Sequence, residues 1–302
     1  MTDLAARPTT GSTPGATGPG RRTAIGLVVG GEFSMQFGAA VAALLVARLG
    51  ANGTVALRLG ISALVLLLVC RPRLRGRTCG DLLTVLGYGL ALGGMNICFY
   101  EAIARIPLGA AVTLEVLGPL ALSVLTGRGL LGALWAVLAL AGVALLGEGG
   151  FTGLDVVGVG FALLAGALWA CYIVLAQRAG RSFAKLDGLA LALTVSAALA
   201  LPLGIAGVGA ALLDPVALGW GAAVAVLSSL LPYSLELVAL RSVPANTFAV
   251  VMSLSPAVAA LAGALVLGQA LTPVGAVAIA LVVAACAGAV RWGGRRSTPV
   301  EA

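Results

Sequence analysis

The chain carries an internal duplication, visible as two proline pairs with the same spacing. Pro107 and Pro119 are twelve residues apart, and so are Pro244 and Pro256. A single offset of 137 residues carries the first pair onto the second. Each pair falls in the fourth of five long apolar segments within its half of the chain. The sequence is therefore interpreted as two repeats of five segments.

The composition is typical of a membrane protein and not of a protein surrounded by water. Hydrophobic residues make up 60% of it, charged residues only 10%, and the mean hydropathy is +1.10. Apolar runs of about 17 to 25 residues are long enough to cross the hydrocarbon core as helices, and they lack the alternation of barrel strands. We expect an all-α, polytopic membrane protein of ten transmembrane helices, at about 24–47, 54–70, 82–103, 109–126, 130–147, 156–176, 188–210, 218–238, 245–267 and 273–290.

The positions of Lys and Arg predict the orientation, because cytoplasmic flanks retain positive charge. With the N-terminus inside, fifteen of the eighteen Lys and Arg residues fall on the cytoplasmic side, and Arg48, Arg58 and Arg105 fall toward the outside. Both termini are therefore predicted to be cytoplasmic. Because five is an odd number, the second repeat enters the bilayer from the opposite side, which gives the inverted repeat found in many secondary transporters.

This division predicts four parts of the chain. Residues 1–22 are rich in Gly, Pro, Thr and Ser, so they are expected to form a disordered cytoplasmic tail and not a cleaved signal peptide. The first five-helix repeat is expected at 23–150 and the second at 151–290. A short cytoplasmic tail follows at 291–302, where Trp292 is placed to sit among the lipid headgroups.

The chain offers little material for metal or redox chemistry. It contains no histidine, and its five cysteines include no Cys-x-x-Cys pair. We expect free thiols, no metal site and no cofactor. The net charge of +7 is explained by the membrane topology, so no nucleic-acid partner is expected. No Gly-x-x-x-x-Gly-Lys sequence occurs, so energy must come from gradients or exchange and not from ATP.

Two carboxylates stand inside predicted spans, where an ionisable group is costly and points to function. Glu32 is near the middle of the first span, and Gln36 lies one turn further on the same face, so the two side chains are candidates for a cavity wall. Glu115 lies four residues before Pro119, which cannot donate to the Glu115 carbonyl. The freed carbonyl beside a carboxylate would suit an ammonium group or a proton. In each case the alternative is a structural role, with the carboxyl group packed against a neighbouring helix.

Further polar and aromatic residues complete the candidate site. They are predicted to line a central cavity or its mouths, or else to be belt and packing residues: Asn96, Tyr100, Trp169, Tyr172, Tyr233 and Glu236. Pro119 and Pro256 are expected to kink their helices, and the Met252 carbonyl is freed by Pro256 as that of Glu115 is by Pro119. Arg58 is expected to extend toward the outer surface. Glu101 and Arg105, four residues apart, are expected to be a solvated pair and not a gate.

Two stretches carry a family resemblance. Residues 104–120, ARIPLGAAVTLEVLGPL, and residues 231–241, LPYSLELVALR, continuing to Ser253-Leu-Ser-Pro256, resemble the threonine/homoserine exporter family of the drug/metabolite transporter superfamily, built from paired EamA-type repeats. The resemblance covers about residues 24 to 290. It implies a ten-helix inner-membrane carrier that exports small amino acids or similar metabolites against proton entry. Gln269 stands where such repeats usually have Glu, which weakens a role for a carboxylate there.

The sequence thus predicts a secondary transporter of the cytoplasmic membrane, not an enzyme, that works by proton-coupled alternating access. Its expected partners are a small-molecule substrate, protons and membrane lipids, with the chain as a monomer or homodimer. The main competing hypothesis is a broad exporter of aromatic or hydrophobic compounds and drugs. A membrane-embedded enzyme or a non-transporting scaffold is disfavoured, because the chain lacks histidine and places carboxylates inside its spans.

Overall fold

The computed structural model describes residues 21–72, 77–126, 130–145, 154–183, 186–232, 235 and 252–294. These ranges are helical and contain no strand, which confirms the all-α class. Four helices are long and apolar enough to cross a membrane, namely Ile25–Cys70, Cys79–Ile103, Val156–Ser182 and Asp187–Leu213, and shorter apolar helices accompany them. Ten spans, the inverted repeats, their boundaries and the cytoplasmic termini stay predictions.

The first two predicted spans form one bent helix, α1 (Arg21–Cys70), which turns at Gly50. Gly50 has φ 66° and ψ 173°, a conformation that is open almost only to glycine. The chain therefore changes direction at a single residue instead of through a loop. The two arms of α1, before and after Gly50, provide separate faces for the other helices.

Four more helices are described in the first half. They are α2 (Cys79–Ile103), α3 (Leu108–Glu115), α4 (Leu117–Thr126) and α5 (Leu130–Leu145). A capping box between Thr78 and Asp81 begins α2. The span predicted at 109–126 is interrupted at Val116, so it comprises both α3 and α4.

The second half begins with α6 (Val156–Ser182) and α7 (Asp187–Val208), followed by the 3₁₀ turn η2 (Gly209–Leu213). Then come α8 (Pro215–Ala225), the π-helical turn η3 (Val226–Leu230), α11 (Ser255–Leu267) and α12 (Pro273–Gly294). Asp155 and Asp214 cap α6 and α8 through their side chains. The helix α6 ends six residues beyond the predicted end at 176. The prediction followed the apolar run, which stops before the charged residues, whereas the helix continues through them.

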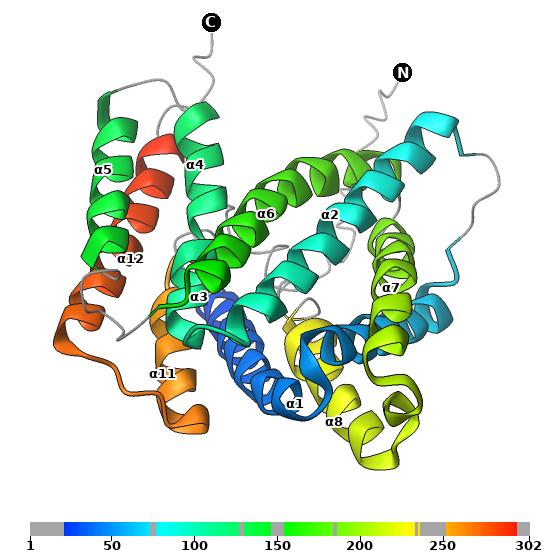
Figure 1. Cartoon of the computed structure of the whole chain (residues 1–302). Helices are drawn as coiled ribbons and strands as arrows, with labels where there is room; N and C mark the ends of the chain where they lie inside the picture. Colours follow the sequence, from blue (N-terminus) through cyan, green and yellow to red (C-terminus); the bar gives the residue numbers. More distant parts are fainter. Residues whose placement is uncertain are drawn as a thin grey trace, which may run out of the picture.

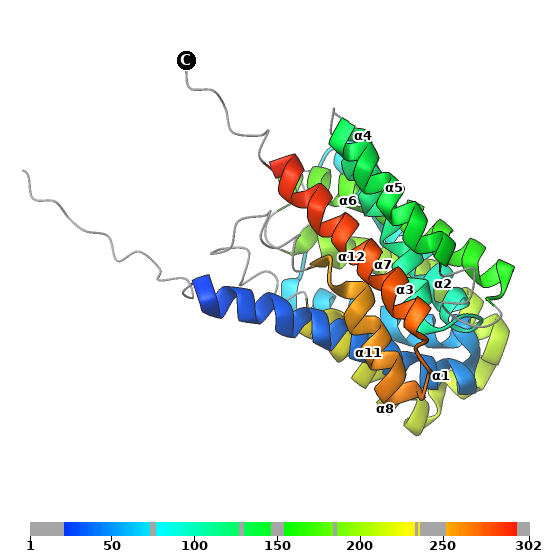
Figure 2. The same cartoon turned by 90° about the vertical axis from the view of Figure 1, so that its left-hand side faces the viewer.

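Most of the extensive helix contacts join the two halves of the chain. The helix α2 packs against α6 and α7, α3 against α11, and α5 against α12, while α1 contacts α7, α8 and α11. Figure 1 shows α2 and α6 side by side across the middle, with α5 and α12 together on the left. Figure 2 shows the α5 and α12 pair again from the side. Neither half therefore buries its helices by itself.

Large apolar side chains also cover much of the outside. Val69, Leu125 and Leu265, for example, are 73%, 83% and 69% exposed. So many large apolar side chains would be unfavourable on a surface that faces water. Such faces suit the hydrocarbon of a bilayer. The polar side chains Glu32, Gln36, Arg58, Asn96 and Glu115 are instead buried inside the helical bundle.

Candidate functional site

The buried guanidinium of Arg58 is the centre of a polar site that joins three helical elements. Arg58 is 7% exposed and lies on the second arm of α1. Its Nη1 donates to the Tyr100 hydroxyl on α2 at 3.2 Å, and the guanidinium lies over the Tyr100 ring, 5.6 Å from the centroid. Its Nε donates to Ser229 Oγ at 3.3 Å, and its Nη2 donates to the Ser228 carbonyl at 3.0 Å.

The prediction that Arg58 reaches the outer surface was wrong. An arginine a few residues inside a span can extend its head to the interface, but here the hydrogen-bond acceptors are inside the bundle. The acceptors come from α2 and η3, which are 42 and about 170 residues away along the chain. From the sequence, Arg58 was left out of the candidate site, although its charge within an apolar span is the same signal that singled out Glu32 and Glu115.

The π-helical turn η3 is held by both arms of α1. Ser34, on the first arm, donates to the Leu227 carbonyl at 2.7 Å, while Arg58, on the second arm, bonds to Ser228 and Ser229. Gly38 on the first arm leaves no space for a side chain, since a Cβ there would stand 2.9 Å from that of Leu227. Turns of π-helix are frequent at functional sites because they displace backbone carbonyls from the regular ladder.

Glu115 ends α3 and is buried beside this site. Its carboxyl group is near enough to Arg58 for the two groups to interact electrostatically, so both lie in one region of the bundle. The helix is interrupted at Val116, three residues before Pro119, and Leu120 donates to the Val116 carbonyl. The structure thus has a break where Pro119 was expected to produce a kink.

The backbone at this break lies against α6. A Cβ on Gly166 would stand 2.5 Å from the Glu115 carbonyl oxygen, and a Cβ on Gly118 would overlap the Gly166 backbone. Two glycines facing each other permit this close approach, as small residues do in other membrane helices. The carbonyl that Pro119 deprives of a donor therefore faces the Gly166 backbone.

Glu32 and Gln36 are a second buried polar pair, on the first arm of α1. The Gln36 amide donates to Glu32 Oε1 at 2.8 Å, as their spacing of one turn suggested. Glu32 is 2% exposed, and its other oxygen, Oε2, has no hydrogen-bond partner among the described residues. The Ser255 hydroxyl at the start of α11 lies next to this carboxyl group. An unpartnered carboxyl oxygen at this depth can accept a proton or a hydrogen bond from a ligand.

Pro256 lies at the N-terminal end of α11 and not within a continuous helix. The Met252 carbonyl, which has no backbone donor at Pro256, accepts a hydrogen bond from the Ser255 hydroxyl at 2.6 Å. A side chain thus replaces the missing backbone donor. Because Ser255 also lies beside Glu32, this helix end connects α11 with the first arm of α1.

The remaining candidates are not gathered in one place. Asn96 is buried, and its amide donates to the Leu92 carbonyl within its own helix at 2.8 Å. Trp169 packs with the apolar cluster around Val116, Leu120, Val282 and Cys286, and the Tyr172 ring lies 5.3 Å from that of Tyr88. Tyr233 and Glu236 lie outside the described residues. A pocket of about 510 Å³ between the first arm of α1, η2 and α8 is lined by none of the predicted site residues.

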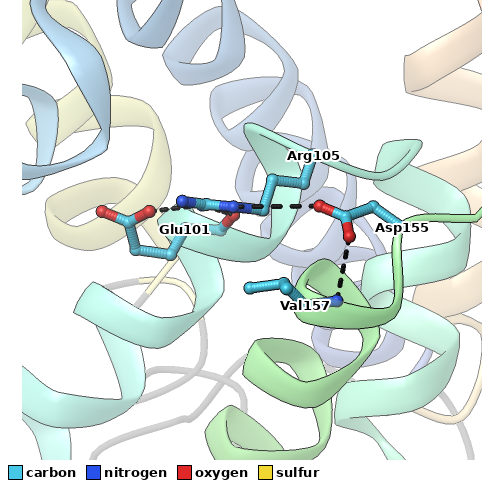
Figure 3. A network of polar contacts seen from close by, with 4 residues as sticks. All are labelled: Glu101, Arg105, Asp155 and Val157. Atoms are coloured by element: carbon cyan, nitrogen blue, oxygen red, sulfur yellow. Dashed lines mark hydrogen bonds and ion pairs between the residues drawn. The ribbon is translucent and has the colours of Figure 1, made fainter.

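Glu101 and Arg105 belong to a larger polar contact at one end of the bundle. Figure 3 shows Arg105 between Glu101 and Asp155, with Asp155 also accepting from the Val157 amide at 3.0 Å. The Arg105 and Asp155 side chains are 3.9 Å apart and both partly exposed. The pair predicted from sequence therefore has a third member, which joins the end of α2 to the start of α6.

The described residues contain no group of three metal-binding side chains, and the five cysteines are free thiols. The polar sites are instead suited to holding charged groups of a small molecule, since they combine a cation, carboxyl groups and hydroxyls within an apolar bundle.

Comparisons with known proteins agree with this description. Residues 156–291 match the EamA-like transporter family. The threonine/homoserine exporter RhtA of Salmonella typhimurium (strain SL1344) is 42% identical over 258 residues, covering 84% of this chain and 87% of that protein. The exporter of the same name from Escherichia coli (strain K12) is 41% identical over the same length. A crystal structure at 22% identity shares the fold, with a TM-score of 0.58 over 91% of this chain and 98% of the other.

The helical fold, its apolar exterior and the EamA match define the class: a multi-pass transporter of the cell membrane and not an enzyme. Within that class, the identity over most of its length shows that the chain belongs to the threonine/homoserine exporter family. The resemblance noted in the sequence is thereby confirmed, and the chain is an exporter.

Proposed function

We propose that this exporter moves small amino acids such as threonine or homoserine out of the cytoplasm, across the cytoplasmic membrane. The observation that carries the proposal is the similarity to proteins named for these two substrates, at 42% identity over 84% of the chain. A bundle that buries both a guanidinium and carboxyl groups supports it, because an amino acid carries both an ammonium and a carboxylate group.

Export is proposed to be coupled to proton entry by alternating access. Glu32 and Glu115 are the proposed coupling residues, because each is a buried carboxyl group that can change its charge by gaining or losing a proton. The inverted repeats would supply the motion, with one set of helices moving against the other around the central polar groups. Pro119 and Pro256, at the helix interruptions, would mark the positions where segments change direction.

The substrate contacts are proposed to come from polar side chains near these carboxylates. Gln36 is bonded to Glu32, and Tyr100 to Arg58, so both are connected to the charged groups. Asn96 lies on the same helix as Tyr100, one turn before it. We propose that Tyr233 and Glu236 lie at one mouth of the substrate cavity. Trp169 and Tyr172 are proposed to line its wall.

The deciding experiment is counterflow into vesicles that contain the purified full-length protein. Labelled threonine outside should accumulate when unlabelled threonine or homoserine is loaded inside, and it should not accumulate when aromatic toxins or drugs are loaded. Asn96→Leu should reduce amino-acid counterflow, while Trp169→Ala should leave most of it. Exchange driven by aromatic compounds and not by amino acids would replace this proposal with the broad-exporter hypothesis.

A further inference from the structure

The pocket of about 510 Å³ between the first arm of α1, η2 and α8 has no part in the transport site described above. Its lining combines Arg48, Asp214 and Trp220 with apolar side chains. We infer that this pocket binds the headgroup of a zwitterionic membrane phospholipid, one that carries a phosphate and a primary ammonium, as phosphatidylethanolamine does. The inference goes beyond the proposed function and does not depend on which cargo is exported.

Arg48 gives the pocket a cation that is not committed elsewhere. It lies two residues before the bend at Gly50, and its side chain is exposed. Within the described part of the chain it takes part in no hydrogen bond and no ion pair. A guanidinium presents its donors in a planar fork that matches two oxygens of a phosphate. Arg48 can therefore bind a phosphate without first losing another partner.

Asp214 gives the pocket a carboxylate with one oxygen available. Its Oδ1 accepts from the backbone N–H groups of Val216 and Ala217 at 2.8 and 3.0 Å, which caps α8 and holds the side chain in place. Its Oδ2 has no hydrogen-bond partner among the described residues, and no ion pair there joins Asp214 to Arg48. Both charges are thus available to a ligand that carries charges of both signs.

This pair of charges selects among phospholipids by their headgroups. A phosphate on the guanidinium and a primary ammonium on the carboxylate both form charge-assisted hydrogen bonds. The quaternary ammonium of phosphatidylcholine has no N–H to donate to Asp214. Phosphatidylglycerol has no ammonium at all, so its net negative charge would be repelled by the same carboxylate. The primary ammonium therefore distinguishes the proposed ligand from both alternatives.

The surroundings of the pocket suit a lipid better than a soluble cargo. Leu213, Val216 and Trp220 line it and are exposed, so its wall continues into an apolar surface on which acyl chains can lie. An exposed tryptophan is typical of the headgroup level of a membrane. Arg48 is sixteen residues from Glu32 along α1, or about 24 Å at the rise of a helix. A cargo held at the buried polar groups would not touch this pocket.

A lipid in this pocket would contact both halves of the chain. The helix α1 belongs to the first half, and η2 and α8 belong to the second. Figure 1 shows α1 and α8 together at the lower edge of the bundle, and the two helices are in extensive contact. A ligand that binds only the folded protein raises its stability, so the bound lipid should stabilise this junction.

The inference is tested by native mass spectrometry of the purified full-length protein in detergent. The protein is titrated with phosphatidylethanolamine, phosphatidylcholine and phosphatidylglycerol that carry the same acyl chains. Phosphatidylethanolamine should bind at least about fivefold more tightly than the other two, because it alone satisfies both charges. An excess of threonine should not displace it, since the cargo site lies elsewhere.

Two variants remove the charges one at a time. Arg48→Gln should weaken binding of phosphatidylethanolamine about fivefold, through loss of the phosphate contact. Asp214→Asn keeps the cap of α8, because Asn caps a helix as well as Asp does, but it loses the charge. In this variant phosphatidylethanolamine and phosphatidylglycerol should bind within about twofold of each other.

The chain offers a matched control for each variant. Arg105→Gln removes another partly exposed arginine, and Asp155→Asn replaces another aspartate that caps a helix. Neither residue lines the pocket, so both control proteins should keep the wild-type preference for phosphatidylethanolamine.

A second measurement tests the location of the lipid in vesicles. Trp220 is made the only tryptophan by replacing Trp135, Trp169 and Trp292 with Phe. Phosphatidylethanolamine with brominated acyl chains should then quench the Trp220 fluorescence more strongly than brominated phosphatidylcholine at the same mole fraction. Equal quenching by the two lipids would contradict a selective site beside Trp220.

Three other results would also overturn the inference. They are equal binding of the three lipids by the wild-type protein, retention of the full preference by Asp214→Asn, and displacement of the lipid by threonine, which would assign the pocket to the cargo. If a variant does not fold, the wild-type titration and the threonine competition decide the matter. Each of these results is independent of whether amino acids are exported, so the proposed function is tested separately.

Discussion

The side chain of Gln269 accepts a hydrogen bond from the backbone N–H of Leu108 at 3.0 Å, although 161 residues separate the two. Leu108 is the first residue of α3, and Pro107 before it offers no side-chain cap. A residue between α11 and α12 therefore caps a helix of the first half. This gives a structural role to the position at which related repeats usually carry Glu.

Replacing Gln269 should distinguish this cap from a functional carboxylate. Gln269→Leu leaves the Leu108 N–H without its acceptor and is expected to destabilise the protein by about 1 to 3 kcal/mol. Gln269→Glu keeps an acceptor oxygen and adds a favourable charge at a helix N-terminus, so stability should be equal or higher. Thermal unfolding of the two detergent-solubilised variants measures the difference, and equal melting temperatures would contradict the cap.

Substitution of the facing glycines should disturb the helix break. Gly166→Ala places a methyl group 2.5 Å from the Glu115 carbonyl oxygen, so the helices must move apart, at a cost of about 1 to 3 kcal/mol. Gly160→Ala on the same helix meets no described atom within 4 Å, and its better helix propensity should make it neutral or slightly stabilising. Fluorescence-detected size exclusion after heating compares the pair. Equal retention of both proteins would show that α3 and α6 do not need this approach.

Asp155 combines an ion pair with a helix cap, and two variants separate these roles. Asp155→Asn should keep the bond to the Val157 amide and lose only the partly exposed contact to Arg105, so stability should change by less than about 1 kcal/mol. Asp155→Ala should lose about 1 kcal/mol through the cap. Melting temperatures and threonine counterflow are the measurements. A large loss of transport in Asp155→Asn, with stability unchanged, would show that the Arg105 contact acts as a gate.

The buried carboxyl groups should control the pH dependence of transport. Glu32→Gln and Glu115→Gln keep hydrogen-bonding capacity but cannot take up or release a proton. Each variant is expected to insert normally and to lose the stimulation of threonine transport by an imposed pH gradient. Uptake into vesicles across a range of internal and external pH measures this effect. Unchanged pH profiles in both variants would assign the two residues to packing.

The predicted orientation can be tested with the natural cysteines. Cys79 is exposed at the start of α2, whereas Cys98 on the same helix is buried. In variants that retain one cysteine, a membrane-impermeant maleimide should label Cys79 only in inside-out vesicles, and the Cys98 protein should stay unlabelled from either side. Labelling of Cys79 in intact cells would reverse the assignment of both termini to the cytoplasm.

The sequence by itself determined the class of the protein and the approximate extent of its helices. The predicted spans at 82–103 and 188–210 correspond closely to α2 (Cys79–Ile103) and α7 (Asp187–Val208). The pairing of Gln36 with Glu32 also followed from their spacing. These features could be predicted because the length of an apolar run and the spacing of one helical turn are local properties of a chain.

Only the tertiary structure decided where the polar side chains find their partners. The position of Arg58 depends on acceptors in η3 about 170 residues away, and the role of Gln269 depends on a helix start in the other half. The break at Val116 likewise needs the glycine of α6 that faces it. No local pattern contains such information, because a hydrogen bond between distant segments depends on how the helices pack, and helix packing is a property of the whole chain.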